Sequence, residues 1–204
     1  MTRNRNNVLA GAPNVAVSGG FFAGPVITDK AQYPTDATAT LPASLKSMGF
    51  ISEDGVTKTV DRSTEQIKDW NLDLVAVLTS EHNVQLQATF LEAANADVLK
   101  MIAGEENVTV DGNKISVKET SDDLPHRSIA FEIKGAGQAA ARVFAADVQV
   151  SSVGDISFTK ADLIKYEVTF DCFADLDNAK LHTFFKTDPA VTAPEEDDTE
   201  GGGV

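Results

Sequence analysis

The sequence predicts a mainly β fold: an antiparallel β-sandwich or barrel with one flanking α-helix, an extended N-terminal arm and a long loop. Three observations lead to this prediction. Apolar and polar residues alternate through much of the chain after residue 72, and this period of two residues is typical of half-buried strands. Apolar residues recur at helical spacing over about three turns that start near residue 95. With 204 residues, 42% of them hydrophobic, the chain is long enough to bury one core.

The chain divides into three parts by composition. Residues 1–40 are rich in Asn, Ala, Gly and Thr and are interrupted by glycine and proline, so we expect an arm with short extended pieces at 12–17 and 21–29. Residues 41–185 form the predicted β domain. The tail, 186–204, has no apolar periodicity and carries six acidic residues and no base after Lys186, so we expect it to be disordered.

A long polar loop over residues 41–71 opens the predicted domain. Within it, Ser52-Glu53-Asp54-Gly55 is typical of a turn, because glycine can adopt a positive φ and Asp54 can bond its own backbone. The loop also holds the single tryptophan, Trp70. Long loops on compact domains are often binding elements, so this one is a candidate for function.

Period-two alternation predicts the strands that follow. The first two form a hairpin with its turn at 80–83, and the next two form a tight hairpin around Gly112-Asn113 in which Val110 faces Ile115. The predicted strands span residues 72–79, 84–90, 108–111, 114–117, 128–134, 141–150 and 161–173.

One helix is predicted at about 95–103, where Leu99 and Ile102 recur at helical spacing between an N-cap at Asn95 and Gly104. A second, short helix is predicted at 177–186, carrying Leu181, Phe184 and Phe185.

Charge and cysteine content exclude several classes of function. A net charge of -14 does not supply the general positive charge with which proteins bind nucleic acid. The single cysteine, Cys172, excludes an internal disulfide and any multi-cysteine metal site, and its apolar neighbours indicate a buried structural thiol. No apolar run approaches the roughly 20 residues of a membrane helix, and the N-terminus lacks a signal peptide. We therefore expect a soluble protein made in the cytosol, with no membrane partner.

The motifs that could carry catalysis are weak. Residues 135–140 satisfy the G-x-G-x-x-A dinucleotide pattern, but the residues that follow alternate as a strand, whereas the pattern requires a helix at that point. Nothing in the sequence brings His82, His126 and His182 together. The stretch 175–178 fails the calcium-loop pattern, since its glycine and closing glutamate positions are lysines. We predict no enzyme activity, no cofactor and no metal.

Three segments resemble a known family: MGFISEDGV (48–56), STEQIKDWNLDLV (63–75) and GDISFTKADLIKYEVTFDCFAD (154–175). They resemble the major tail (tail tube) proteins of long-tailed, non-contractile bacteriophages, particularly those of phages that infect actinobacteria. The resemblance covers most of residues 40–185.

The resemblance implies a structural virion protein of the tail, synthesised in the host cytoplasm. Six copies would close into a ring, and stacked rings would form a hollow tube through which DNA passes without specific binding. The implied partners are further copies of the chain together with the tape-measure, tail-terminator and distal-tail proteins.

Two sets of residues are candidates for roles in such a tube. For ring-to-ring contact the candidates lie in the 41–71 loop, with Trp70 alternatively packing into its own core beside Ile67. For the lumen they lie on polar strand faces, because an acidic and neutral lining keeps phosphate from sticking. The inter-ring candidates are Phe50, Ile51, Glu53, Asp54 and Trp70, and the lumen candidates are Asp147, Gln149, Glu167 and Asp171.

Two alternatives remain open. One is a tube protein of a contractile tail or secretion apparatus, which has a related ring-forming fold. The other is a monomeric small-ligand-binding or enzymatic β module, supported only by the glycine pattern at 135–140.

Overall fold

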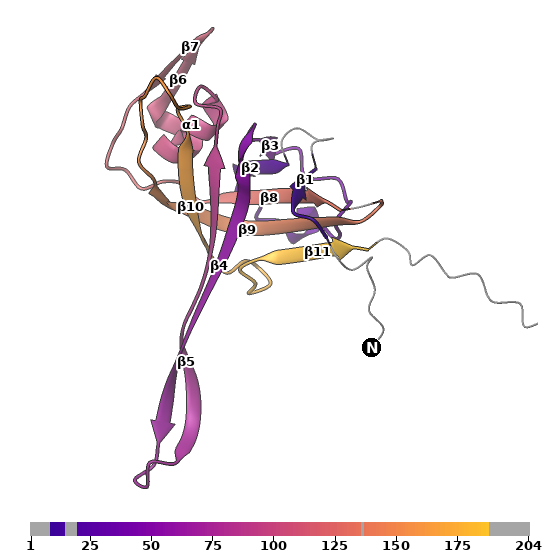
Figure 1. Ribbon diagram of the computed structural model, residues 1–204, viewed down its shortest axis with the longest axis vertical. Coiled ribbons are helices and arrows are strands. Elements are labelled where there is room, and N and C mark those ends of the chain that lie inside the picture. Colours follow the sequence, from indigo (N-terminus) through magenta and orange to yellow (C-terminus); the bar gives the residue numbers. More distant parts are fainter. Residues whose placement is uncertain (1–8, 15–19, 136, 188–204) are drawn as a thin grey trace, which may run out of the picture.

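The computed structural model describes residues 9–14, 20–135 and 137–187. The predicted mainly β class is confirmed: within these ranges there are eleven strands and one α-helix (Figure 1). In chain order they are β1 (Ala12–Pro13), β2 (Phe21–Pro25), β3 (Lys46–Ser47), β4 (Ile51–Lys68), β5 (Leu74–Phe90), α1 (Ala96–Ala103), β6 (Val108–Asp111), β7 (Lys114–Val117), β8 (Arg127–Lys134), β9 (Ala140–Val153), β10 (Tyr166–Cys172) and β11 (His182–Lys186).

Nine strands form one antiparallel sheet in the order β3-β2-β8-β9-β10-β5-β4, with β1 added to β8 and β11 added to β9. The short segment between β3 and β4 joins the two ends of this path. There the Met48 amide donates to the Phe21 carbonyl over 2.9 Å, and the Leu91 amide donates to the Phe50 carbonyl over 3.0 Å. The sheet therefore nearly closes on itself, as a sandwich or barrel requires.

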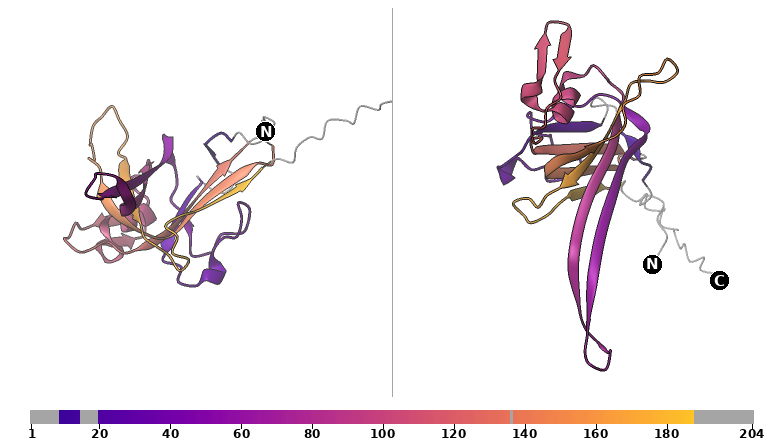
Figure 2. Two further views of the ribbon diagram at one scale, coloured as in Figure 1. Left: turned by 90° about the horizontal axis from the view of Figure 1, so that it is seen from below. Right: turned by 90° about the vertical axis from the view of Figure 1, so that its left-hand side faces the viewer.

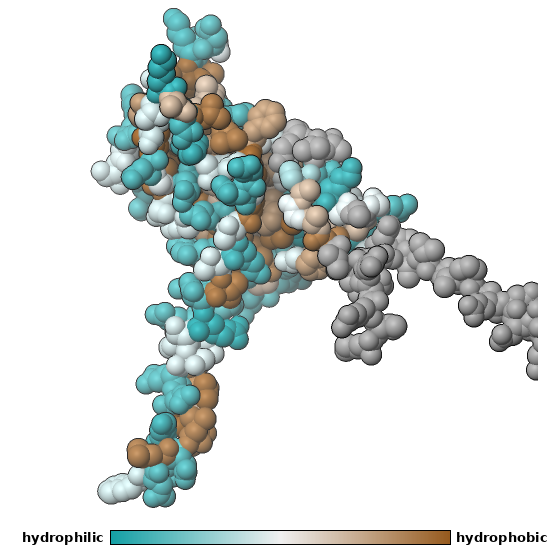
Figure 3. Space-filling view, viewed as in Figure 1, coloured by the Kyte–Doolittle hydropathy of each residue, from teal (hydrophilic) through white to brown (hydrophobic). Residues whose placement is uncertain are grey.

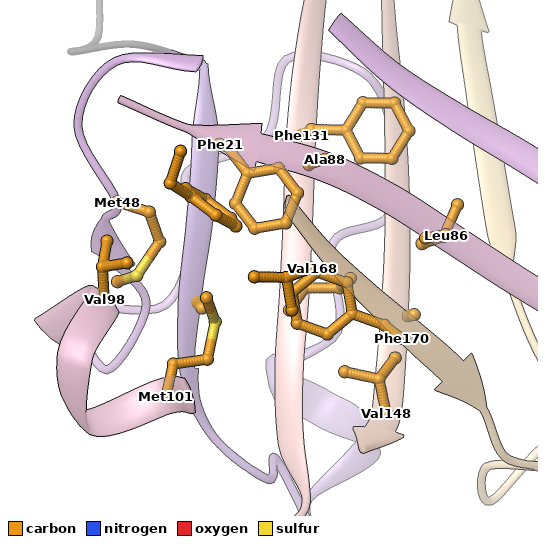
Figure 4. Close-up of a cluster of buried hydrophobic side chains, with 14 of the residues drawn as sticks. Phe21, Met48, Leu86, Ala88, Val98, Met101, Phe131, Val148, Val168 and Phe170 are labelled. Carbon is orange, nitrogen blue, oxygen red and sulfur yellow. The ribbon is translucent and has the colours of Figure 1, made fainter. Parts of the chain in front are cut away.

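The main core lies inside this curved sheet (Figure 4). The ring of Phe21 meets that of Phe90 edge-on, with centroids 5.2 Å apart, and stacks on that of Phe131. Helix α1 contributes Val98 and Met101, both fully buried, from one end. The helix is therefore held by its apolar side against the sheet.

A second apolar cluster lies on the other side of β2, β8 and β9, built from Phe22, Ala130 and Phe144 and covered by Ile27 and Leu45. This part of the sheet is therefore buried on both faces. Strands buried on both faces lose their alternation, which explains the continuous apolar runs at 21–23 and 143–146. The predicted N-terminal arm therefore includes core positions among its described residues after residue 20.

Several elements match the prediction closely. Asn95 caps α1, with its side-chain Oδ1 accepting from the Asp97 amide over 3.0 Å, and Gly104 ends the helix with φ 97°. The β6-β7 hairpin has the predicted register, with Val110 opposite Ile115. Strands β8 and β9 fall where they were expected, and β10 is shorter than expected, beginning at Tyr166.

The predicted loop over 41–71 is wrong for residues 46–47 and 51–68, which form β3 and β4, and the predicted hairpin at 72–90 is instead the single strand β5. Strands β4 and β5 pair along nearly their whole length. The connecting turn lies at 69–73, where Leu72 has φ 68°. Polar residues on both faces of β4 conceal its alternation, which is why the sequence reads as a loop.

Two predicted turns are irregularities inside strands. Ser80 is a bulge: Glu81 pairs with Ser63 and Thr79 with Thr64, so β5 carries one extra residue there. Residues 52–55 lie within β4 at a register shift, where Gly55 does have the expected positive φ of 69°.

The helix predicted at 177–186 is wrong: His182–Lys186 form β11, paired with β9. Leu181 packs on the main core and Phe184 on the second cluster. Side chains three residues apart share one side of a helix, whereas Leu181, which directly precedes β11, and Phe184, within it, contact clusters on opposite sides of the sheet. The predicted disordered tail from residue 188, and the predicted arm at 1–8 and 15–19, lie outside the described residues.

Candidate assembly surfaces

The outer part of the β4-β5 hairpin leaves the body as a free two-stranded arm (Figures 1 and 2). We call residues 60–82 the distal hairpin. Every residue in it except Ala76 is exposed. Its large apolar side chains are exposed by 43–99%, namely Val60, Ile67, Trp70, Leu72, Leu74, Val75, Val77 and Leu78. Exposed apolar surface of this extent is typical of a protein–protein contact.

By strand register, apolar groups occupy both faces of the distal hairpin, and the space-filling view in Figure 3 shows part of this apolar surface along the hairpin. On one side Ile67 lies opposite Ala76, and on the other Val77 lies opposite Gln66. An isolated two-stranded hairpin is only marginally stable in water, because neither face is buried. The distal hairpin therefore lacks a core of its own.

A polar face covers the outside of the sheet behind the main core. Two cross-strand bonds join it: Gln85 Nε2 donates to Asp171 Oδ1 and Gln87 Nε2 donates to Glu167 Oε1, each over 2.7 Å. By strand register, the polar face comprises Thr57, Thr59 and Asp61 of β4, Gln85, Gln87 and Thr89 of β5, Glu167, Thr169 and Asp171 of β10, and Asp147 and Gln149 of β9. These strand positions carry acidic, amide and hydroxyl groups and no lysine or arginine, while Lys180 lines a neighbouring pocket together with Gln85 and Asp171.

The structure brings the four predicted lumen residues together on this polar face. Asp171 lies opposite Gln149 in the β10-β9 register. Segment 124–126 covers part of the β9 end: His126 Nδ1 is 2.6 Å from Asp147 Oδ1, and Gln149 Nε2 donates to the Leu124 carbonyl over 2.7 Å. Glu167 is the most open of the four. Their role in a lumen stays a prediction.

The five predicted inter-ring residues are not brought together. Four of them line a groove of about 650 Å³ at the start of β4; its lining is Gly11, Pro13, Gly20, Phe50, Ile51, Ser52, Glu53, Asp54, Gly55, Val56, Phe131, Glu132 and Ile133. Trp70 lies at the opposite end of β4 and is 99% exposed. The alternative that Trp70 packs into its own core is therefore wrong.

Sequence reasoning assigned Leu74 and Leu78 of β5 to a core-facing side, and Val75 and Val77 to an outer face that could meet a neighbouring copy. Leu74 and Leu78 are instead more than half exposed. The available signal was the presence of Val75 and Val77 on the second face of the same strand, since a strand with one solvated face alternates.

The weak catalytic motifs have structural explanations. The glycine pattern at 135–140 joins β8 to β9, which pair as an antiparallel hairpin with Lys134 opposite Ala140, so no helix begins there. His126 pairs with Asp147 and His182 with Asp175, as two separate pairs. Among the described residues, no three His, Cys, Asp or Glu side chains form a metal-binding group. Nor is any helix in that part of the chain long and apolar enough to cross a membrane.

Cys172 is expected to be unreactive in the folded protein. Burial, with a smaller contribution from the neighbouring Asp171 carboxylate, raises the pKa of its thiol to about 12, so little thiolate forms at neutral pH. At pH 8 a maleimide should leave the native chain unlabelled and label it fully in denaturant. Rapid labelling of the native chain, followed by mass spectrometry, would show that β10 opens.

Comparisons with known proteins identify the family. The family model described as "Phage tail tube protein" matches residues 1–196. No curated protein sequence matches the chain. Among solved structures, the cap of the anti-feeding prophage, described as a tube terminating cap, aligns at 10% identity and TM-score 0.45, covering 92% of this chain and 99% of that one.

A second solved structure, the sheath–tube complex of an extracellular contractile injection system, aligns at 9% identity and TM-score 0.43, covering 92% of this chain and 100% of that one. Both scores lie below 0.5, so neither bears on function. The family match spans nearly the whole chain, and with it the chain belongs to the phage tail tube proteins, structural components of the virion tail.

Proposed function

We propose that six copies of the chain close into a ring, that rings stack into the tube of a long, non-contractile phage tail, and that DNA passes through the lumen. The observation that carries the proposal is the polar face, which extends over β4, β5, β10 and β9 and holds no lysine or arginine. The non-contractile, actinophage-type assignment rests on the resemblance of the three segments 48–56, 63–75 and 154–175.

Ring closure has a structural basis in two strand edges. Within the described chain, β4 pairs with β5 alone, so its other edge is unpaired. On the far side of the same four strands, β8 pairs with β9 only as far as Val148, so the edge at 149–153 is also open. Joining the β4 edge of one copy to the 149–153 edge of the next would continue the sheet around a ring and remove both exposed edges.

The polar face then lines the lumen, with Asp147, Gln149, Glu167 and Asp171 among its residues. Repeated around a ring, its carboxylates repel the phosphate backbone, while amides and hydroxyls offer no fixed positive charge. DNA passes without being held. A tube structure that has these side chains on its outer wall would overturn this assignment.

Further copies of the chain are the main partners, and synthesis takes place in the host cytoplasm. The tape-measure, tail-terminator and distal-tail proteins are partners by family resemblance, at the inside and the two ends of the tube. Negative-stain electron microscopy of the purified chain tests the central claim. Stacked six-membered rings or hollow tubes support it, and a chain that stays monomeric at high concentration contradicts it.

Adding positive charge to the polar face is expected to make tubes retain DNA. Thr57 and Thr59 are exposed on this face, so the variant T57K/T59K adds two lysines per copy inside the lumen. Tubes of this variant should retain a labelled oligonucleotide at low salt, protect it from nuclease, and release it as salt rises.

The matched control is Q32K/T40K, which adds two lysines at exposed positions in the loop between β2 and β3. DNA bound to that variant should be digested by nuclease. Equal nuclease sensitivity of the DNA on both variants would place Thr57 and Thr59 outside the lumen.

A further inference from the structure

We propose that the loop between β9 and β10, residues 154–165, docks on the neighbouring copy of the same ring: its tip, residues 158–161, enters the groove at the start of β4 in that copy. This inference rests on the proposed function, because it presupposes a closed ring. It adds a side-chain contact to the pairing of the two strand edges. Of the residues predicted for ring-to-ring contact, the four that line the groove then act within a ring, and Trp70 alone stays a candidate between rings.

The first argument is the form of the loop. Ile156 and Ile164, near its two ends, pack against the main core. The side chains between them are turned outwards, since Phe158 is 78% exposed and Leu163 is 62% exposed. The loop is therefore held at both ends and offers two large apolar side chains to solvent, as a contact surface does.

The second argument is the direction of the strands. Strands β4, β5, β10 and β9 pair antiparallel in that order, so β9 runs opposite to β4. Rotation about a ring axis keeps these directions, so the 149–153 edge of one copy runs antiparallel to β4 of the next. The loop that follows β9 therefore lies beside the start of the neighbour's β4. Figure 1 shows this loop and the start of β4 at the same end of the molecule, away from the tip of the distal hairpin.

The polar face determines how far the two edges overlap. Alternate residues of the stretch 57–61 carry it on β4, and Gln149 carries it on β9. A polar face that continues from copy to copy places residues 149–153 beside 57–61, which leaves residues 50–56 for the loop. The chain from the end of β9 to the start of the tip reaches about 16 Å at roughly 3.3 Å per residue.

The third argument is the match of apolar surfaces. The groove lies between the start of β4 and the later part of β8, two strands of the described sheet that do not pair, so it opens along the unpaired side of β4. Its lining includes Val56, Phe131 and Ile133, and Phe50 at its side is 68% exposed. Aromatic side chains that fill apolar pockets dominate the energetics of protein contacts, and Phe158 is such a side chain.

The fourth argument is charge. Glu53 and Asp54 are exposed on the groove, and its described lining holds no lysine or arginine. The tip carries a single charge, that of Lys160. In the part of the chain that the structure describes, none of these three side chains forms an ion pair.

The other charges of the loop lie outside the tip. Lys165 and Asp162 pair with each other over 3.2 Å. Asp155 lies at the base of the loop, next to the end of β9. The tip therefore brings a cation and an aromatic ring to a groove that is acidic and apolar.

Cysteine cross-linking tests the contact, because Cys172 is 4% exposed and gives little background. The variant S52C/T159C places one thiol in the groove and one in the tip. On assembly and mild oxidation, the monomer band on a non-reducing gel should give way to a ladder that ends at six copies, because a contact within a closed ring returns to its starting copy. A short bismaleimide linker covers a small offset between the thiols.

The matched control is T35C/T159C, in which the first thiol moves to another exposed loop. Rings of this variant should stay monomeric on the gel. Equal cross-linking in the control, a ladder that continues beyond six copies, or no cross-link in S52C/T159C rings would overturn the loop contact while the rings themselves remain. If the wild-type chain forms neither rings nor tubes, the proposed function fails and this inference fails with it.

Discussion

Replacing Arg142 with alanine is expected to lower the free energy of unfolding by about 3–5 kcal/mol, because it leaves the Glu132 carboxylate buried without its partner. The two side chains are 3% and 9% exposed and form an ion pair across β9 and β8. Arg142 also donates to the carbonyls of Asp36 and Ala39, over 3.0 and 2.6 Å, so it fastens the loop between β2 and β3 to the sheet.

Urea unfolding at pH 7 measures this loss. The double variant R142M/E132M is the control, because replacing a whole buried pair with apolar side chains is often neutral. If the double variant is as unstable as R142A, the loop carbonyls rather than the charge pair account for the effect. A loss below about 1 kcal/mol in R142A would show that the pair is not buried in solution.

Replacing Phe21 with alanine is expected to cost about 3–5 kcal/mol, the usual range for removing a buried aromatic ring. The ring is fully buried and contacts Phe90, Phe131 and Phe170. The control is Leu72→Ala, which removes a side chain that is 76% exposed and should change the monomer's stability by less than about 0.5 kcal/mol. Equal effects in thermal or urea unfolding would mean that β2 is not part of the core.

The elements that could be predicted are those with a local signal of their own. Helix α1 has an N-cap, an apolar side and a terminal glycine within ten residues, and the β6-β7 hairpin has its turn residues between matched strands. Strand β10 alternates cleanly because one face covers the main core and the other belongs to the polar face. At these elements the local sequence pattern and the tertiary packing favour the same secondary structure.

The elements that could not be predicted depend on distant partners. The extended piece expected at 21–29 contains β2, but its burial on both faces by segments far away in the chain was not expected, and β11 is fixed by pairing with β9. Strand β4 has polar residues on both sides, so no alternation marks it. The candidate contact residues were read as one patch because they are close in sequence, and only the extended strand between them reveals two separate surfaces.

The bulge at Ser80 affects how readily free subunits aggregate before assembly. Long, flat, unpaired strand edges are templates on which chains aggregate. An extra residue in β5 increases the local twist of the hairpin, so two such arms cannot lie flat against each other along their length. The distal hairpin needs a neighbour for stability. The bulge hinders it from pairing with the hairpin of another free subunit while subunits accumulate before assembly.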